Sequence, residues 1–198
     1  MDKGRAIVMD IVWCNSQIDF INNIDSFINS TDELCKITIM DKTEAIYIDE
    51  GTCDLEWCKQ HAIPFARQSY FFNAGCIIAV KGNIFIDAKV KVNGENAADV
   101  FSKALCKYFI DKGFTSVRCD NNDVLIDGFK VASGCESLVN DLNYMGYQIS
   151  INQDLETIKH VCKKEMVKVP KALSDYGITT EEMIEFCINF FKNGIQKD

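Results

Sequence analysis

The stretch NDVLIDGFKVASGC, residues 122–135, decides the fold of this chain because it fixes one lysine beside a tight hairpin. The apolar run Val124–Ile126 predicts a short strand, and Asp127-Gly128 is a dipeptide that favours a two-residue type I′ turn. The return strand begins at Phe129, so alternation places Lys130 on the face opposite its two apolar neighbours. A cation held on a sheet can stabilise an anion that develops in a reaction, whereas the simpler interpretation is a solvated strand lysine.

The same stretch resembles the lysine motif of the lipoate-protein ligases and biotin ligases, with its Asn-Asp pair, strand, Asp-Gly-x-Lys and small-residue patch. Three further stretches resemble that family in the same order along the chain, at residues 54–67, 75–84 and 169–178. Each match is short, and the order of the matches carries the resemblance. It implies a single biotin/lipoate ligase-like catalytic domain over residues 1–198. Its expected fold is α/β (α+β), with a mixed, largely antiparallel sheet flanked by helices, as in class II synthetases.

The resemblance also implies an activity, which is acyl transfer to a lysine on a lipoyl- or acyl-carrier domain. Lipoate or octanoate is the expected substrate, and Lys130 would lie beside its carboxylate and the phosphate of an adenylate. Asn122 and Asp123 would orient the nucleotide, a magnesium ion or the incoming amine, although such a pair also simply initiates turns. The implied substrate-binding residues are Arg67, Asn73, Gly75, Gly82, Asn83, Asn122, Asp123, Ser133 and Gly134.

Departures from the family pattern argue against the use of ATP and Mg²⁺. The Ser-Gly-Gly-Gly loop of the family is replaced by Phe72–Gly75, where two side chains occupy positions at which the backbone would approach phosphate. The paired arginines are reduced to Arg67-Gln68, and a His-Gly pair becomes Met145-Gly146. Residues 130–134 fit two registers, a lipoate-type motif with one inserted residue and a biotin-type motif. An accessory chain could complete such a site.

Cys135 supports a second catalytic hypothesis, because acyltransferases of the same fold pass the acyl group through a cysteine thioester without ATP. A nearby Lys130 would raise the thiolate fraction of this cysteine. Cys76, just after Gly75, is a weaker candidate for the same role. The competing interpretation is that Cys135 fills the core, as the chain has ten cysteines.

Composition limits the classes of protein that fit. The chain has 198 residues and a formal net charge of -8, so we expect one domain that binds no nucleic acid. An acidic carrier would be repelled at long range and would need a local basic patch, for which the candidates are Lys163, Lys164, Lys168 and Lys171. Cysteines spread through apolar segments predict reduced thiols, and the absence of a leader or long apolar run predicts a cytoplasmic protein that does not enter the membrane.

Hydrophobic periodicity predicts alternating strands and helices along the chain. We expect strands at 6–13, 34–40, 45–48 and 84–92, the last with one wet face, and another at 144–151. Helices are expected at 18–28, 97–112 and 154–163. A short helix is capped by Asp54, and a last helix begins with the capping box of Thr179 and Glu182 and ends at Gly194.

Metal binding is not expected, since the spacings of Cys53, Cys58, His61, His160 and Cys162 do not match the usual zinc pairs. The best interpretation is an enzyme similar to lipoate-protein ligases or lipoyl/octanoyl transferases. The alternative is a catalytically degenerate member of the fold that binds a ligand or a partner protein without transfer.

Overall fold

The computed structural model describes residues 9–30, 34–40, 45–48, 53–63, 65–67, 76–79, 81–92, 95–139, 142–152, 155–162 and 167–194. The strands are β1 (Met9–Cys14), β2 (Cys35–Met40), β3 (Ala45–Ile48), β4 (Phe65–Arg67), β5 (Cys76–Ala79), β6 (Ile84–Ala88), β7 (Lys91–Val92), β8 (Glu95–Asn96), β9 (Val117–Asp120), β10 (Asp123–Ile126), β11 (Phe129–Val139) and β12 (Leu142–Ile149). The helices are α1 (Gln17–Asn29), α2 (Leu55–Gln60), α3 (Ala97–Asp111), α4 (Leu155–Val161) and α5 (Thr180–Gly194), with a short 3₁₀ helix at Leu173–Tyr176.

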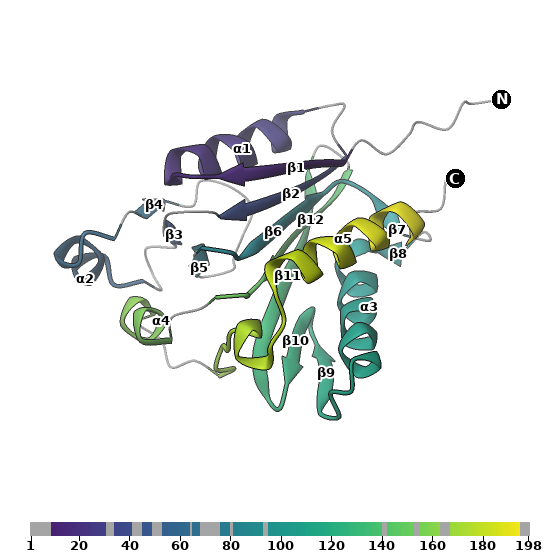
Figure 1. Ribbon diagram of the computed structural model, residues 1–198. Helices are drawn as coiled ribbons and strands as arrows, with labels where there is room; N and C mark the ends of the chain where they lie inside the picture. The colour runs from purple at the N-terminus through teal and green to yellow at the C-terminus, as the bar shows by residue number, and fades with distance from the viewer. Residues whose placement is uncertain are drawn as a thin grey trace.

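A seven-stranded sheet forms the centre of the molecule, in the order β1-β2-β6-β12-β11-β10-β9. Only the β1–β2 pair is parallel among these strands, and each of the other neighbouring pairs is antiparallel. A three-stranded sheet, β4-β3-β5, and a two-stranded sheet, β7-β8, accompany it. Figure 1 shows α1 and the three-stranded sheet on one side of the central sheet, and α3 and α5 on the other. The predicted mixed, largely antiparallel fold is therefore confirmed.

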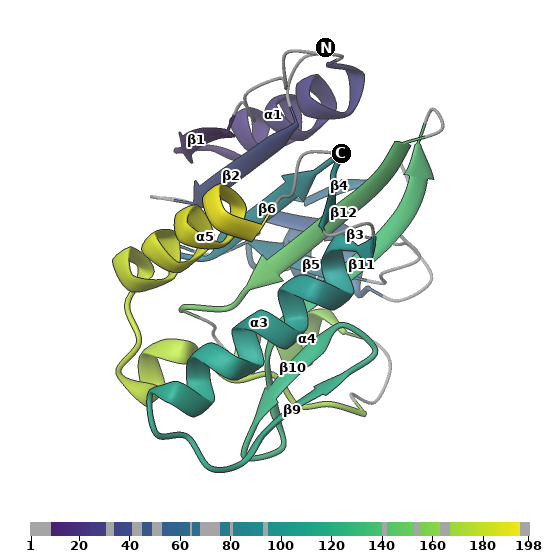
Figure 2. The same ribbon diagram turned by 90° about the vertical axis from the view of Figure 1, so that its right-hand side faces the viewer.

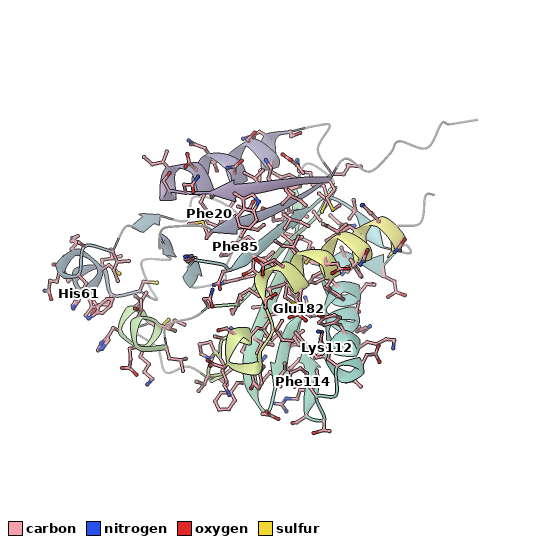
Figure 3. The ribbon with its side chains drawn as sticks, in the orientation of Figure 1. Phe20, His61, Phe85, Lys112, Phe114 and Glu182 are labelled. Carbon is pink, nitrogen blue, oxygen red and sulfur yellow. The ribbon has the colours of Figure 1, made fainter. Side chains whose placement is uncertain are left out.

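The main hydrophobic core lies between the central sheet and the helices α3 and α5, which Figure 2 shows crossing in front of the strands. Phe101 of α3 is fully buried there and packs against rings from β12 and α5. On the opposite face, Phe20 of α1 packs edge-on against Phe85 of β6, with ring centroids 4.7 Å apart (Figure 3). Both faces of the central strands are thus covered.

This double covering explains why the strand prediction for residues 84–92 is wrong. The sequence predicts a single strand over residues 84–92 with a wet face, but β6 ends at Ala88 and all five of its side chains are buried. Asp87 is 4% exposed and Lys89 is 7% exposed. The Lys89 ammonium donates to the carbonyls of Phe27, Ile28 and Ser30 at the end of α1. Lys89 is therefore buried because a helix end supplies its partners, whereas buried Asp87 accepts a hydrogen bond from the Tyr144 hydroxyl.

Helix ends agree with the sequence more closely. The Asp54 side chain accepts from Trp57 N–H and caps α2, as predicted. Before α5, Thr179 N–H donates to the Glu182 carboxylate at 2.9 Å, and Glu182 N–H donates to Thr179 Oγ1 at 3.2 Å, which confirms the capping box. Among the described residues, no helix combines the length and the apolar character that a membrane crossing requires.

Candidate functional site

The hairpin between β10 and β11 holds Lys130 as the sequence predicts. Asp127 and Gly128 have φ values of 54° and 84°, so both central residues of the turn lie in the left-handed region that a type I′ turn requires. Lys130 pairs with Leu125, which places it on the same face as Asp123. Its side chain is 32% exposed, so the ammonium is held on the sheet and remains accessible.

One extra residue in β11 changes which side chains accompany Lys130. The register shifts between Val124 and Leu125, so Val124 lies opposite Ala132 while Leu125 lies opposite Lys130. Val131 and Ala132 are both buried, and Ser133 returns to the face of Lys130. Simple alternation from Lys130 would have selected Ala132 for the polar face instead of Ser133.

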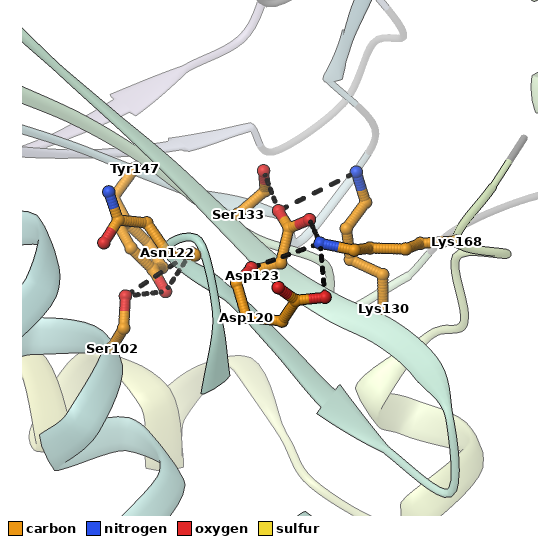
Figure 4. Close-up of polar contacts among 8 residues, drawn as sticks. All are labelled: Ser102, Asp120, Asn122, Asp123, Lys130, Ser133, Tyr147 and Lys168. Atoms are coloured by element: carbon orange, nitrogen blue, oxygen red, sulfur yellow. Dashed lines mark hydrogen bonds and ion pairs between the residues drawn. The ribbon is translucent and has the colours of Figure 1, made fainter. Parts of the chain in front are cut away.

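Asp123 is the centre of a polar cluster beside Lys130 (Figure 4). Ser133 Oγ donates to Asp123 Oδ1 at 2.7 Å, and Lys130 Nζ lies 4.0 Å from the same oxygen. Lys168 Nζ lies 2.7 Å from Asp123 Oδ2 and 3.1 Å from Asp120 Oδ2. The carboxylate of Asp123 is only 15% exposed. Two ammonium groups and two carboxylates therefore meet at one end of the central sheet.

Lys168 reaches this cluster because its segment pairs with β11. Lys130 N–H donates to Val169 O and Lys171 N–H donates to Lys130 O, each at 2.9 Å, and Pro170 forms a parallel bridge with Lys130. Burial alone lowers the pKa of Lys168, but hydrogen bonds to Asp123 and Asp120 outweigh it and the pKa is raised. Lys168 is therefore a firmly charged partner of Asp123.

Neither Lys168 nor Asp120 is a predicted site residue. Lys168 is expected only in a basic patch, since it lies 45 residues from Asp123 in the sequence and no local pattern joins the two. Lys171 of that patch lies over the rings of Phe129 and Tyr176. The other two members, Lys163 and Lys164, lie outside the described residues.

Asn122 and Gly134 shape the backbone around the cluster. Asn121 and Asn122 have φ values of 51° and 65°, so they form a second tight turn, between β9 and β10. Asn122 O accepts from Tyr147 Oη at 3.0 Å and from Gly134 N–H at 3.1 Å. A Cβ at Gly134 would lie 2.1 Å from Tyr147 Cδ2, so only glycine leaves room for the ring. These contacts position Asp123, and ligand binding by Asn122 and Gly134 stays a prediction.

Gly82 and Asn83 lie at a corner where three elements meet. Asn83 is fully buried, and its Oδ1 accepts from Ile151 N–H at 2.9 Å and from Asn152 N–H at 3.0 Å. Gly82 has a φ of 81°, and Thr180 Oγ1 donates to its carbonyl at 3.1 Å. These contacts join the start of β6 to the end of β12 and the start of α5. Substrate binding by either residue remains a prediction.

Cys135 lies in β11 on the face of Ser133, where it pairs with Gly146. Burial raises the pKa of its thiol to about 12; a backbone hydrogen bond of Gly146 opposes this shift, and the negative charge of Asp87 reinforces it. The Sγ–H donates to Gly146 O at 3.6 Å. Such a thiol carries little thiolate near neutral pH, so the environment does not favour a nucleophile, and that role stays a prediction.

The remaining candidates fall at or beyond the edge of the described structure. Arg67 ends β4 and pairs with Ile48, but only its backbone is described. Asn73 and Gly75 lie outside the described residues. Within the described part of the chain, no three histidine, cysteine or acidic side chains are arranged to hold a metal ion.

No protein-family model matches the chain, and no curated protein matches its sequence. Solved structures do match its fold. A bipartite lipoate protein ligase from Thermoplasma acidophilum, described with its E2 lipoyl domain, has a TM-score of 0.72 and 12% identity, over 98% of this chain and 87% of that one.

Two further structures extend this likeness. Lipoate-protein ligase A bound with ATP has a TM-score of 0.72 and 12% identity, over 96% of this chain and 87% of that one. LipL1 of P. falciparum in complex with lipoate has a TM-score of 0.64 and 14% identity, over 93% of this chain and 61% of that one. Identities this low show the fold alone, which is that of the biotin/lipoate ligase catalytic domain.

Proposed function

We propose that this chain is a lipoate-protein ligase-like acyltransferase that moves a lipoyl or octanoyl group to a lysine of a carrier domain. One observation carries the proposal. Lys130 is fixed by a tight hairpin with its ammonium accessible, beside an ordered carboxylate and a second lysine. A preorganised cation of this kind can hold a carboxylate or phosphate and stabilise the charge that develops on acyl transfer. The fold shared with three lipoate ligase structures supports the same direction.

The two lysines of the cluster have different roles in the proposal. Lys168 lies closer to Asp123 than Lys130 does, at 2.7 Å against 4.0 Å, so Lys168 neutralises most of that carboxylate. The ammonium of Lys130 then has charge available for an anionic substrate. Ser133 fixes the orientation of Asp123 through its 2.7 Å hydrogen bond. In this proposal Lys130 binds substrate, and Lys168 and Ser133 are positioning residues.

ATP and Mg²⁺ fit the described residues unequally. The accessible Lys130 ammonium suits the phosphate of an adenylate. Asp120 and Asp123 supply oxygens of the type that Mg²⁺ prefers, but Lys168 already bridges them, so an ion there would have to displace an ammonium. The proposal therefore places no metal ion between Asp120 and Asp123. The acyl donor in the proposal is either an acyl adenylate or an acyl-carrier thioester.

An acylation assay tests the proposal. The purified chain is mixed with a lipoyl domain and given either lipoate, ATP and Mg²⁺, or an octanoyl-carrier protein, and the acceptor is followed by intact mass. We expect acceptor acylation in one arm, lost by at least tenfold in Lys130→Ala. Lys107→Ala is the matched control, because that lysine is 74% exposed on α3 and forms an ion pair with Asp111 on the same helix. No acylation in either arm by folded protein would reject the transferase.

A binding module without transfer is the second candidate. The position of Lys168 favours a binding module. An acceptor amine would need a carboxylate as its partner, and Lys168 already occupies the Asp123 carboxylate. The burial and the raised pKa of Cys135 favour it too, since they weaken a thioester route. Lipoate binding measured by calorimetry, lost in Lys130→Ala and without acceptor acylation, would identify this function.

A further inference from the structure

Cys53 and Cys162 face each other across an isolated antiparallel bridge, outside the cluster around Lys130. Cys53 lies just before α2 and Cys162 just after α4, two helices that Figure 1 shows at the same end of the molecule. Asp54 N–H donates to Val161 O at 2.8 Å, and Cys162 N–H donates to Ile158 O at 3.0 Å. This pattern makes the two cysteines a non-hydrogen-bonded pair, the kind whose Cα atoms lie about 4.5 Å apart.

That spacing falls inside the Cα separation of disulfides, roughly 4.4–6.8 Å. Both residues are thiols in the structure. We propose that Cys53 and Cys162 form a reversible disulfide that ties α2 to α4. The proposal is independent of the acyl transfer suggested above, because neither cysteine belongs to that site.

The difference in burial between the two cysteines sets the order of reaction. Cys53 is fully buried in an apolar cluster with Cys58, Ile158 and Val161, whereas Cys162 is only partly buried. A reagent from solution therefore reaches Cys162 first, and Cys53 acts as the resolving thiol.

The aromatic contacts beside the pair hold the two helices together. Trp57 of α2 stacks on His61, just after α2, and on His160 of α4, with ring centroids 4.1 Å and 5.0 Å away.

Thiol–disulfide exchange with a small-molecule disulfide such as oxidised glutathione balances the reaction. The Cys162 thiolate attacks one sulfur of that reagent, which forms a mixed disulfide and releases one glutathione thiolate. The Cys53 thiolate then attacks the Cys162 sulfur and releases the second glutathione. Two protein thiols are oxidised, one glutathione disulfide is reduced to two thiols, and the two protein protons go to the released glutathione.

Intact mass and peptide mapping of the full chain test the proposal, after incubation with oxidised glutathione at pH 8 and quenching by acid. We expect loss of two hydrogen atoms and a cross-linked peptide pair containing Cys53 and Cys162, both reversed by dithiothreitol. In Cys162→Ser the cross-link should be absent. In Cys53→Ser a glutathione adduct should persist on Cys162, because the resolving thiol is gone.

Two other close thiol pairs provide the competing outcomes. Burial, and then the charge that Cys53 carries as a thiolate, raise the pKa of Cys58, so these two thiols are close. Cys106 is hydrogen-bonded to the exposed Cys119. Cys58→Ser and Cys119→Ser should leave the Cys53–Cys162 link unchanged. A link that joins only Cys53 to Cys58, a link confined to Cys106 and Cys119, or glutathione adducts without any cross-link in the wild type would each overturn the proposal.

Discussion

Gly134 lies against the ring of Tyr147, and the ring fits there because glycine has no side chain. The ring cannot move aside easily, because Tyr147 Oη lies 2.9 Å from Ser102 Oγ and donates to Asn122 O. A Cβ at Gly134 would lie 2.1 Å from the ring. We expect Gly134→Ala to lower the free energy of unfolding by about 1–3 kcal/mol, measured by urea denaturation.

A double-mutant cycle separates this clash from a general loss of strand stability. In a Tyr147→Ala background the ring is gone, so the further effect of Gly134→Ala should fall to a few tenths of a kcal/mol. Equal effects of Gly134→Ala in both backgrounds would show that the ring is not the cause.

Cys135 allows a second prediction, about the pH at which its thiol reacts. Because burial raises the pKa of this thiol from 9.0 to about 12, the folded protein keeps it protonated far above neutral pH. Stabilisation from the protonated thiol is present below pH 9 and is lost as the pH rises toward 12. We expect iodoacetamide at pH 8 to label the exposed Cys119 and to leave Cys135 unlabelled until the chain is unfolded, as read by peptide mass spectrometry. Rapid labelling of Cys135 in the native state at pH 8 would restore the thioester hypothesis.

The residues of the site divide by the range of the contacts that place them. The hairpin around Lys130 could be predicted from the sequence, because a type I′ turn depends on two adjacent residues. The contact of Asp123 with Lys168 could not, since it depends on a segment that pairs with β11 only in the folded chain. Ser133 joined the face of Lys130 through a bulge, which breaks the alternation on which sequence prediction relies.

At the scale of elements, α1 shows how a helix end can bury a charge. The carbonyls of Phe27, Ile28 and Ser30 accept from the Lys89 ammonium, which is 7% exposed. Lys89→Met would leave these carbonyls without that donor, so we expect a loss of about 2–3 kcal/mol of unfolding free energy and faster hydrogen exchange in α1. Lys103→Met is the control, as the ion pair of Lys103 with Asp99 is exposed, and it should change stability by less than about 0.5 kcal/mol. Similar effects of the two variants would contradict the role given to Lys89.

The first turn of α5 carries a pH-dependent contribution. The Lys112 ammonium, followed by Thr179 N–H, lowers the pKa of Glu182 from 4.5. A lowered carboxyl pKa stabilises the fold above the unfolded value and loses this effect as the pH falls through the folded value. We expect Glu182→Gln to be less stable than the wild type at pH 7, and the difference to shrink toward zero well below pH 4.5, measured by urea unfolding across this range. A difference that stays constant with pH would mean that the charge of Glu182 does not matter.

The strand over residues 84–92 shows why element prediction failed in one place. Alternating charges normally mark a solvated face, and nothing local indicates that α1 covers it. Asp87 accepts from the buried Tyr144 hydroxyl, and Lys89 binds the end of α1, so both charges have distant partners. The Asp54 cap, the capping box of Thr179 and Glu182 and the helix end at Gly194 were predicted correctly because each of these signals lies within a few residues of the helix end it marks.

At the scale of the whole molecule, net charge and local charge act in opposite directions on a partner. The chain carries a formal charge of -8, so an acidic acceptor domain is repelled at long range. The ammonium groups of Lys130 and Lys168 lie at one end of the central sheet and attract it only at short range, and Lys168 is largely neutralised by Asp120 and Asp123. Repulsion between the two molecules should therefore dominate the encounter.

The dependence of the association rate on salt concentration distinguishes long-range repulsion from short-range attraction. The Debye length falls from about 30 Å at 0.01 M to about 8 Å at 0.15 M, which removes long-range repulsion before it weakens a contact inside the site. We expect the association rate with an acidic lipoyl domain, measured by stopped-flow fluorescence, to rise several-fold between these concentrations. A lipoyl domain made basic by surface substitution should show the reverse dependence, because attraction is then the interaction that salt screens. A rate with the acidic domain that falls with salt would mean that a basic surface guides the encounter, and the four-lysine patch of residues 163–171 would be the first place to look for it.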